Sequence, residues 1–272
     1  MTSRKTLNCC RSILNVGLTL LGYCLHVNLT ALDGPWRCHM RTPRIEREQV
    51  ILAALVLLDQ EGLEGLTLRK LAQTLQIQAP SLYWHFDDKQ SLLDGVADAL
   101  IEQVARSIPA DLPWDSSVRR IAKELRSALL RHRDGARLFT GTYAVSENVL
   151  RVNEAMIDAF VRAGTDAALA STFSFSVVYY VLGFAMEEQA LDPRNALDLA
   201  SRKQAFFEMT KARFPRNWAA REAIFSSDFD ARFMTGLDLL IEGVAQQVSR
   251  IKRRSTERSS TVARATKAKA PG

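Results

Sequence analysis

Three polar side chains stand close together in the sequence, where they could contact nucleic acid. Ser81, Tyr83 and His85 alternate with the larger apolar residues Leu82 and Trp84. Hydroxyl and imidazole groups donate hydrogen bonds to phosphate oxygens and to base edges. The spacing therefore predicts a short segment that presents these donors to DNA.

Two short helices are expected to position these donors. Before them, apolar residues recur at helical spacing at Leu68, Leu71, Ala72 and Leu75. Thr67 stands where it can cap the first turn. Residues 76–78 interrupt the pattern, and Pro80 suits the first turn of a second helix, where its missing N–H needs no partner. Two short helices joined by a tight turn predict a helix-turn-helix over about residues 67–86.

Longer helices are expected on both sides of this motif. The first starts at Thr42 and Pro43, ends at Gly62 and carries an apolar stripe of Val50, Ile51, Ala54, Leu55, Leu57 and Leu58. The other is capped by Asp87, with Gln90 in the capping box, and runs to about residue 106. Its expected buried residues are Leu92, Leu93, Val96, Leu100 and Val104. A helix of that length reaches from a small first domain into a larger second one.

The sequence resembles the TetR family of transcriptional regulators, and its tetracycline-repressor branch most of all. Three motifs carry the resemblance in order: Leu66-Thr-Leu-Arg-Lys-Leu-Ala-Gln-Thr-Leu75 with Ser81-Leu-Tyr-Trp-His-Phe86 and Lys89, then residues 128–136, then residues 182–189. The likeness spans about residues 43–250. It implies an all-α fold, with a three-helix DNA-binding domain at 42–90 and a helical ligand-binding and dimerisation domain at 91–250.

The resemblance also implies which residues contact DNA. It places contacts at Arg69, Pro80, Ser81, Tyr83, His85 and Lys89, with Arg69 and Lys89 on phosphates. Ala79 stands where the tetracycline branch has a base-reading Gln. An alanine offers only a methyl contact, for example to thymine, so we expect a different operator. Gln76 replaces the glycine of the turn, and a positive φ there would cost of the order of 1 kcal/mol. Tyr83 and His85 could instead serve only to cover a helix surface.

The second domain is predicted to be helical throughout. Helices are expected at about 115–132, 147–163, 167–186 and 228–249, with the third ending at Glu187 and the last carrying an apolar seam. The stretch Ala167–Met186 lacks charge and is long enough for a membrane span. Its Ser, Thr and Tyr residues and its lack of a basic flank favour a buried helix of a bundle or an oligomer interface. In the family that the chain resembles, the last two helices form an intersubunit four-helix bundle.

The resemblance also points to a ligand site. In the tetracycline branch the pocket uses a Thr and a Glu, matched here by Thr142 and Glu187, together with a His and an Asn. Phe139 and Ile121 occupy those last two positions, and neither can bind magnesium or donate to a ring system. We therefore expect a mostly apolar effector other than magnesium–tetracycline, with Thr142 or Glu187 as polar anchor. The apolar contacts are expected at Ile121, Leu125, Phe139, Met156 and Tyr179. These apolar residues could equally be core, and Glu187 a solvent-facing carboxylate.

The two ends of the chain differ from the middle. The net charge of +6 comes from the ends, because acidic residues outnumber basic ones in residues 44–250, so charge alone does not indicate DNA binding. Residues 1–41 contain an apolar stretch that we interpret as an over-extended start ahead of Met40, rather than a signal peptide or membrane anchor. Residues 251–272 form a basic tail expected to be disordered. All four cysteines precede Met40, which fits a reducing, cytoplasmic location.

No motif indicates an enzyme. The chain has no Gly-x-Ser-x-Gly elbow, phosphate loop or dinucleotide fingerprint, and its four histidines lack metal-ligand spacing. We expect no catalytic residues, no cofactor and no bound metal. The expected function is a homodimeric repressor of a double-stranded DNA operator, released by a small-molecule effector. The alternative is a helical ligand-binding or interaction protein that no longer reads DNA.

Overall fold

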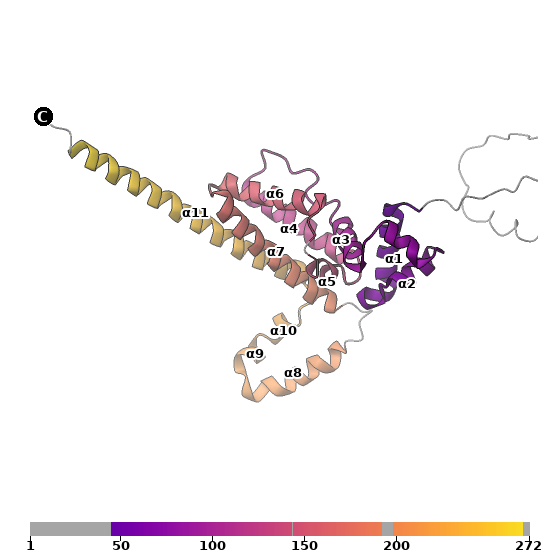
Figure 1. The fold of residues 1–272 in the computed structure, drawn as a ribbon. Helices are drawn as coiled ribbons and strands as arrows, with labels where there is room; N and C mark the ends of the chain where they lie inside the picture. Colours follow the sequence, from indigo (N-terminus) through magenta and orange to yellow (C-terminus); the bar gives the residue numbers. More distant parts are fainter. Residues whose placement is uncertain (1–44, 143, 192–197, 269–272) are drawn as a thin grey trace, which may run out of the picture. The chain divides into compact units, whose positions relative to one another are not determined.

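The computed structural model describes residues 45–142, 144–191 and 198–268, with side chains through Arg254. Within these ranges every regular element is a helix (Figure 1), which confirms the all-α prediction. In chain order the elements are α1 (Arg47–Gly65), α2 (Leu68–Thr74), the 3-10 helix η1 (Ala79–Trp84), α3 (Lys89–Leu100), α4 (Trp114–Leu130), α5 (Gly135–Thr140), α6 (Glu147–Ala163), α7 (Ala167–Ala190), α8 (Leu199–Arg213), α9 (Pro215–Ala219), α10 (Arg221–Ile224) and α11 (Phe229–Ala268). We call α1 to α3 with η1 the head, and α4 to α7 with α11 the body.

The head closes around the apolar stripe of α1. Val50, Ala54 and Leu58 of this helix are fully buried, as are Leu71 of α2 and Leu82 of η1. Burial of several large aliphatic side chains at about 1.5–3 kcal/mol each is what holds these short helices together. The stripe predicted for α1 is therefore its core face.

Helices α1 and α3 begin later than predicted from the sequence. Glu46 caps α1 and forms a reciprocal capping box with Gln49, so α1 starts at Arg47. The predicted cap at Thr42 and the proline after it lie outside the described residues. Asp88, rather than Asp87, caps α3: its carboxylate accepts from the Ser91 N–H at 2.7 Å. Neighbouring carboxylates made the cap ambiguous by one residue.

Helix α3 also ends sooner than the predicted residue 106. Its last residue is Leu100, and the carbonyls that follow turn away from a helical path toward one side chain. The Arg151 guanidinium donates to the carbonyl oxygens of Glu102 at 2.7 Å and Val104 at 3.1 Å. These charge-assisted bonds replace the intrahelical bonds that another turn of α3 would have made.

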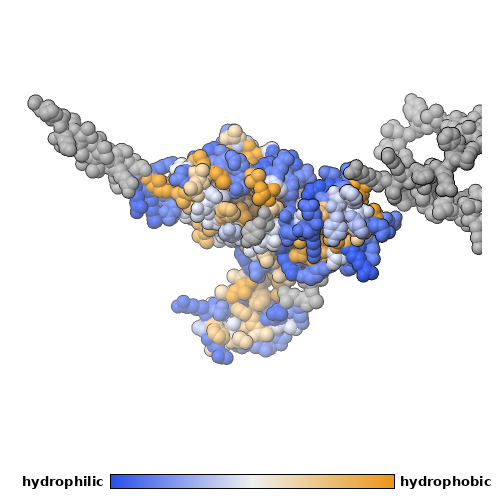
Figure 2. Space-filling model, in the orientation of Figure 1, coloured by the Kyte–Doolittle hydropathy of each residue, from blue (hydrophilic) through white to orange (hydrophobic). Residues whose placement is uncertain are grey.

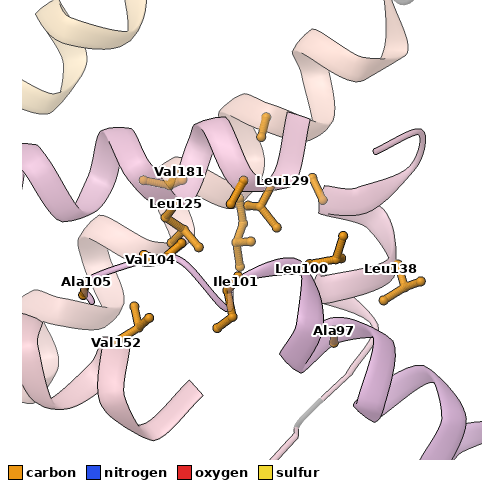
Figure 3. Packing of buried hydrophobic residues seen from close by; sticks show 14 of the residues in the cluster. Ala97, Leu100, Ile101, Val104, Ala105, Leu125, Leu129, Leu138, Val152 and Val181 are labelled. Atoms are coloured by element: carbon orange, nitrogen blue, oxygen red, sulfur yellow. The ribbon is translucent and has the colours of Figure 1, made fainter. Parts of the chain in front are cut away.

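The end of α3 lies inside the body (Figure 3). Apolar side chains from α3 and the residues after it pack among side chains of α4, α5, α6 and α7; those labelled are Ala97, Leu100, Ile101, Val104, Ala105, Leu125, Leu129, Leu138, Val152 and Val181. Because all are buried, a movement of α3 must disturb the body core.

Helix α7 is the uncharged helix of the body. By length and composition it could cross a membrane, the sole helix of the described residues of which this is true, and 33% of its most apolar window is buried. It packs against α4, α6 and α11, with Val177, Val181 and Ala185 fully inward. These contacts place it in the helical bundle, and its other face is left exposed.

Helix α11 packs along α7 and contains the predicted seam. Phe233, Leu237, Ile241, Val244 and Val248 are buried, whereas Phe229 and Leu240 are half-buried. The helix continues to Ala268, so the expected loss of structure after Arg250 is wrong for residues 251–268. That stretch is rich in Ala, Lys and Arg, which favour a helix, and it has no Gly or Pro.

The segment α8 to α10 between α7 and α11 has an aromatic cluster of its own. Phe206 and Phe207 pack edge-to-face against Phe225, and Phe207 also packs against Trp218. Figure 2 shows apolar surface over this segment, where Leu199, Met209, Phe214 and Ile224 are exposed. Helix α9 starts at Pro215, a position in the first turn where the missing N–H of proline needs no partner.

Candidate nucleic-acid interface and ligand site

The helix-turn-helix is held by backbone and cap interactions. Thr67 Oγ1 accepts from the Lys70 N–H at 3.3 Å, as predicted for an N-cap. In the turn Gln76 adopts φ 54°, and the Ile77 N–H returns to the Ala72 carbonyl at 3.0 Å. The left-handed conformation considered for Gln76 is therefore present, at a cost of about 1–2 kcal/mol that the packed head absorbs.

The head brings the predicted DNA-contacting residues onto α2, η1 and the start of α3. Arg69, Pro80, Tyr83 and Lys89 are exposed, whereas Ala79, Ser81 and His85 are half-buried. Lys89 is the first residue of α3, and Pro80 lies in the first turn of η1. The adjacent Lys70 is paired with Glu61 at 2.9 Å, which leaves Arg69 as the cation of α2 that can approach a phosphate.

Two further residues of this surface were missed by the sequence reasoning. Trp84 is 85% exposed although it lies between Tyr83 and His85. Gln78 is exposed and is the N-cap of η1, but its side chain makes no capping bond, so its amide is available. Trp84 could have been identified because no apolar residue at helical spacing is available to pack against it. Gln78 could have been identified because it is the nearest glutamine to Ala79, where the base-reading Gln is missing.

The predicted ligand residues separate into two groups. Ile121, Leu125 and Met156 are fully buried in the closed core of the body. Thr142 donates its hydroxyl to the Phe139 carbonyl at 2.9 Å and follows α5. These five residues belong to the core and to the end of α5, which favours the core interpretation for the three buried ones.

Tyr179 and Glu187 do share a hollow. It has a volume of about 450 Å³ and lies between α7 and the start of α11, with Phe184, Phe229 and Arg232 among its walls. Tyr179 is 66% exposed and stacks on Phe175 at 5.7 Å between ring centroids. The hollow combines aromatic walls with a solvent-facing carboxylate at Glu187.

A largely buried arginine, with 11% of its side chain exposed, joins three body helices beside this hollow. Arg126 of α4 donates two bonds of 2.9 Å to Glu188 of α7 and one of 2.6 Å to Asp230 of α11. Its guanidinium also lies over the rings of Phe184 and Phe233. Burial alone would lower the pKa of Arg126, but the two carboxylates outweigh that effect and raise the pKa above its ordinary value. The side chain is therefore a permanent positive charge that links α4, α7 and α11.

Polar bonds join the head to the body at the turn before α5, and we call this set the latch. Asp59 of α1 accepts from the Arg133 N–H at 2.8 Å and lies 2.9 Å from His132 Nδ1. Asp134 accepts from the Leu63 N–H at 2.9 Å. Gly62 makes the approach possible, because it has φ 73° and an added Cβ would lie 2.9 Å from the Asp134 carboxylate.

The latch is connected to α7. Gln189, in the last turn of that helix, donates to the Leu129 and His132 carbonyls at 2.9 and 2.8 Å and accepts from the Ala136 N–H at 3.1 Å. Outside the latch, Arg137 and Glu64 form an exposed ion pair, and the Arg137 guanidinium lowers the pKa of Glu64. No local sequence pattern predicts these contacts between distant residues.

Comparison with known proteins supports the features described above. The model for the tetR family of bacterial regulatory proteins matches residues 50–96, and the model for the tetracyclin repressor-like C-terminal domain matches residues 109–248. The class A tetracycline repressor protein from transposon 1721 of Escherichia coli is 35% identical over 206 residues, covering 75% of this chain and 92% of the relative.

Two solved structures resemble the chain in both fold and sequence. A structure of BioQ with its double-stranded DNA operator is 32% identical, with a TM-score of 0.54, and the match covers 74% of this chain and 98% of BioQ. A structure of ActR from Streptomyces coelicolor in complex with actinorhodin is 28% identical, with a TM-score of 0.67, and covers 75% and 98%.

A helix-turn-helix head fused to an all-helical body defines a DNA-binding transcriptional regulator. The matched regions and the identity to relatives over most of their length identify which family of regulators this is. The chain belongs to the TetR family of bacterial regulatory proteins.

Proposed function

We propose that the protein is a homodimeric, cytoplasmic repressor that binds an operator through its two heads and is released by a small-molecule effector. The observation that supports this most directly is the set of exposed polar side chains on α2, η1 and α3, on a head that is bonded to a large helical body. Its relatives are named as transcriptional repressors, not as enzymes.

In this proposal the DNA contacts divide by chemistry. Arg69 and Lys89 bind phosphates, and Ser81, Tyr83 and His85 fix the register of the head on the backbone. The N-terminal end of a recognition helix faces the base edges, so Ala79 and Gln78 lie at the reading end of η1. Pro80 fixes the start of this helix.

The exposed face of α7 and α11 supports a homodimer. Phe175 and Tyr179 form an exposed aromatic pair on α7, and Leu239 of α11 is 67% exposed. A Cβ added at Gly183 or Gly243 would meet no atom within 4 Å, so both helices have room for close approach by another helix. Pairing two copies through these helices would cover the uncharged exposed face of α7 and would hold the heads for half-sites about 34–36 Å apart.

The hollow beside Tyr179 is our candidate effector site. Its aromatic walls and the carboxylate of Glu187 suit a planar, mostly apolar molecule with a hydrogen-bond donor. Phe139 and Ile121 offer no ligand to magnesium, so the effector is not a magnesium–tetracycline complex. The relative ActR was crystallised with actinorhodin, an example of an organic ligand in this family.

The latch provides a route from this hollow to the heads. Glu187 lies two residues before Gln189, which holds the turn that contains His132 and Ala136. His132 and the Arg133 N–H of the same turn bond to Asp59 of α1. A coupling of about 1–3 kcal/mol through these contacts would weaken operator binding by about five- to 150-fold.

The test is DNA binding to the region upstream of its own gene. Arg69→Ala with Tyr83→Ala should abolish the specific complex and leave the sedimentation of the dimer unchanged. Arg216→Gln, which removes an exposed cation on α9, is the matched control. If the wild-type protein gives no specific complex at any salt concentration, the proposal fails, and a ligand-binding protein that does not read DNA takes its place.

A further inference from the structure

A second hollow lies on the side of the body that holds the end of α3. It has a volume of about 320 Å³ and lies between α4 and the residues that follow α3. Its donors are Lys123 and Ser127 of α4, Arg131 at the C-cap of α4, and Gln103 after α3. Val104 and Ala128 also line it. We call it the α4 groove. Positions 123, 127 and 131 are four residues apart, so their side chains share one face of the helix.

The two cations of the α4 groove differ from their neighbours. Arg120 is paired with Glu124, and Arg106 is paired with Glu102. Lys123 and Arg131 are exposed and have no ion pair or hydrogen bond within the described part of the chain. Glu188 and Asp230 line an adjoining hollow with them, but both carboxylates are bonded to Arg126.

The carboxylate in the groove does not neutralise them. Glu124 accepts from Arg120 Nε at 2.9 Å with one oxygen and from the Ala105 N–H at 2.8 Å with the other. Both oxygens are thus engaged away from Lys123 and Arg131. A ligand anion would not have to displace an existing partner of either cation, so much of its binding energy would be retained.

The hydroxyl of Ser127 is also available. Thr140 and Ser174, on neighbouring helices, donate their hydroxyls to the carbonyl four residues earlier, which occupies the proton. Ser127 shows no such bond in the described structure. The Gln103 amide makes one long bond of 3.4 Å to Glu102, which a better acceptor would displace.

We propose that the α4 groove binds a small organic anion, a carboxylate or phosphate ester that carries a compact apolar group. Lys123 and Arg131 would hold the anion, Ser127 and Gln103 would donate to it, and its apolar part would lie on Val104 and Ala128. The volume lies at the lower end of the range for ligand sites, about 300–1,000 Å³. Nothing in the effector hollow beside Tyr179 takes part, so the two sites can be tested separately.

The position of the groove gives binding a regulatory consequence, which rests on the proposed function. Gln103 and Val104 belong to the segment that Arg151 and Glu124 fix after the end of α3. An anion that bridges this segment and α4 would make α3 harder to move relative to the body. We therefore expect it to change operator affinity through the head.

The binding test uses the full chain and calorimetric titration with four probes: phenyl phosphate, benzoate, inorganic phosphate and phenol. Phenyl phosphate and benzoate should bind saturably, inorganic phosphate more weakly, and phenol not at all. Lys123→Gln with Arg131→Gln should weaken phenyl phosphate by about tenfold or more, since two charged hydrogen-bond donors are lost. Arg216→Gln with Arg250→Gln removes the same charge elsewhere and should bind as the wild type does.

Two results would refute the proposed anion site in the α4 groove. One is equal binding of phenyl phosphate by the Lys123/Arg131 variant and the control. The other is equal binding of inorganic phosphate and phenyl phosphate, which would indicate a general charge effect. Operator affinity measured without any anion tests the proposed function independently of the anion site. A protein that binds phenyl phosphate in the groove but never binds its operator would refute the repressor and keep the site.

Discussion

Cutting the latch should loosen the head without loosening the body. Asp59 accepts a backbone bond from Arg133 and faces His132, and it is only half-buried. A hydrogen bond to a charged group contributes about 1.5–3 kcal/mol when buried, and partial exposure reduces this. We therefore expect Asp59→Ala to lower the local stability of the head by about 1–3 kcal/mol, which corresponds to about five- to 150-fold faster exchange of its amides.

Hydrogen exchange followed by mass spectrometry measures this directly. Peptides from α1 and α2 should exchange faster in Asp59→Ala, while peptides from α4 and α7 should keep their wild-type rates. Glu64→Gln is the control, since it removes an exposed pair with Arg137 that contributes little to stability. Equal acceleration in head and body, or no acceleration in either, would show that the latch is not the element that joins them.

Three other outcomes follow from the geometry. Glu188→Gln should destabilise the fold by about 2 kcal/mol, because it leaves the 11%-exposed Arg126 with a single carboxylate. Asp230→Asn, at a position 87% exposed, should cost only about 0.5 kcal/mol. Urea unfolding of the two variants measures both free energies. Gly243→Ala should weaken the dimer in sedimentation equilibrium if a partner helix packs there, and an increase in stability of about 1 kcal/mol with unchanged association would contradict that interface. Gln78→Ala should reduce discrimination at one base pair by about 1–3 kcal/mol and spare non-specific binding, which a panel of operator variants in a gel-shift assay would test.

The local features of this protein could be predicted from its sequence because they depend on neighbouring residues. The Thr67 cap and the end of α6 at Gly164 each follow from side-chain chemistry within a few positions. The periodicity of α11 likewise identified its buried seam. Such signals are strong enough to give the fold class and the order of helices.

Features that depend on distant residues could not be predicted in this way. Helix α3 ends at Leu100 because Arg151, far along the chain, binds the carbonyls that follow it. Ile121, Leu125 and Met156 were expected around a ligand, and the structure shows that they are buried where α4 packs against α6 and α7. Apolar spacing identifies a buried face, but it does not distinguish a face that lines a cavity from one that fills it.

The two sites proposed for small molecules lie on different helices of the body and use opposite chemistry. Beside α7 the walls are aromatic and the free charge is the carboxylate of Glu187, while in the α4 groove the free charges are Lys123 and Arg131. The two linings share no residue, and Arg126 is already bonded to Glu188 and Asp230, so it offers no free charge to either ligand. A planar donor and a compact anion can therefore bind at once. The planar donor acts on the head through Gln189 and the latch, and the anion acts through the residues after α3. A substitution that removes only one of these two sets of contacts should therefore abolish the effect of one ligand on operator affinity and spare the effect of the other.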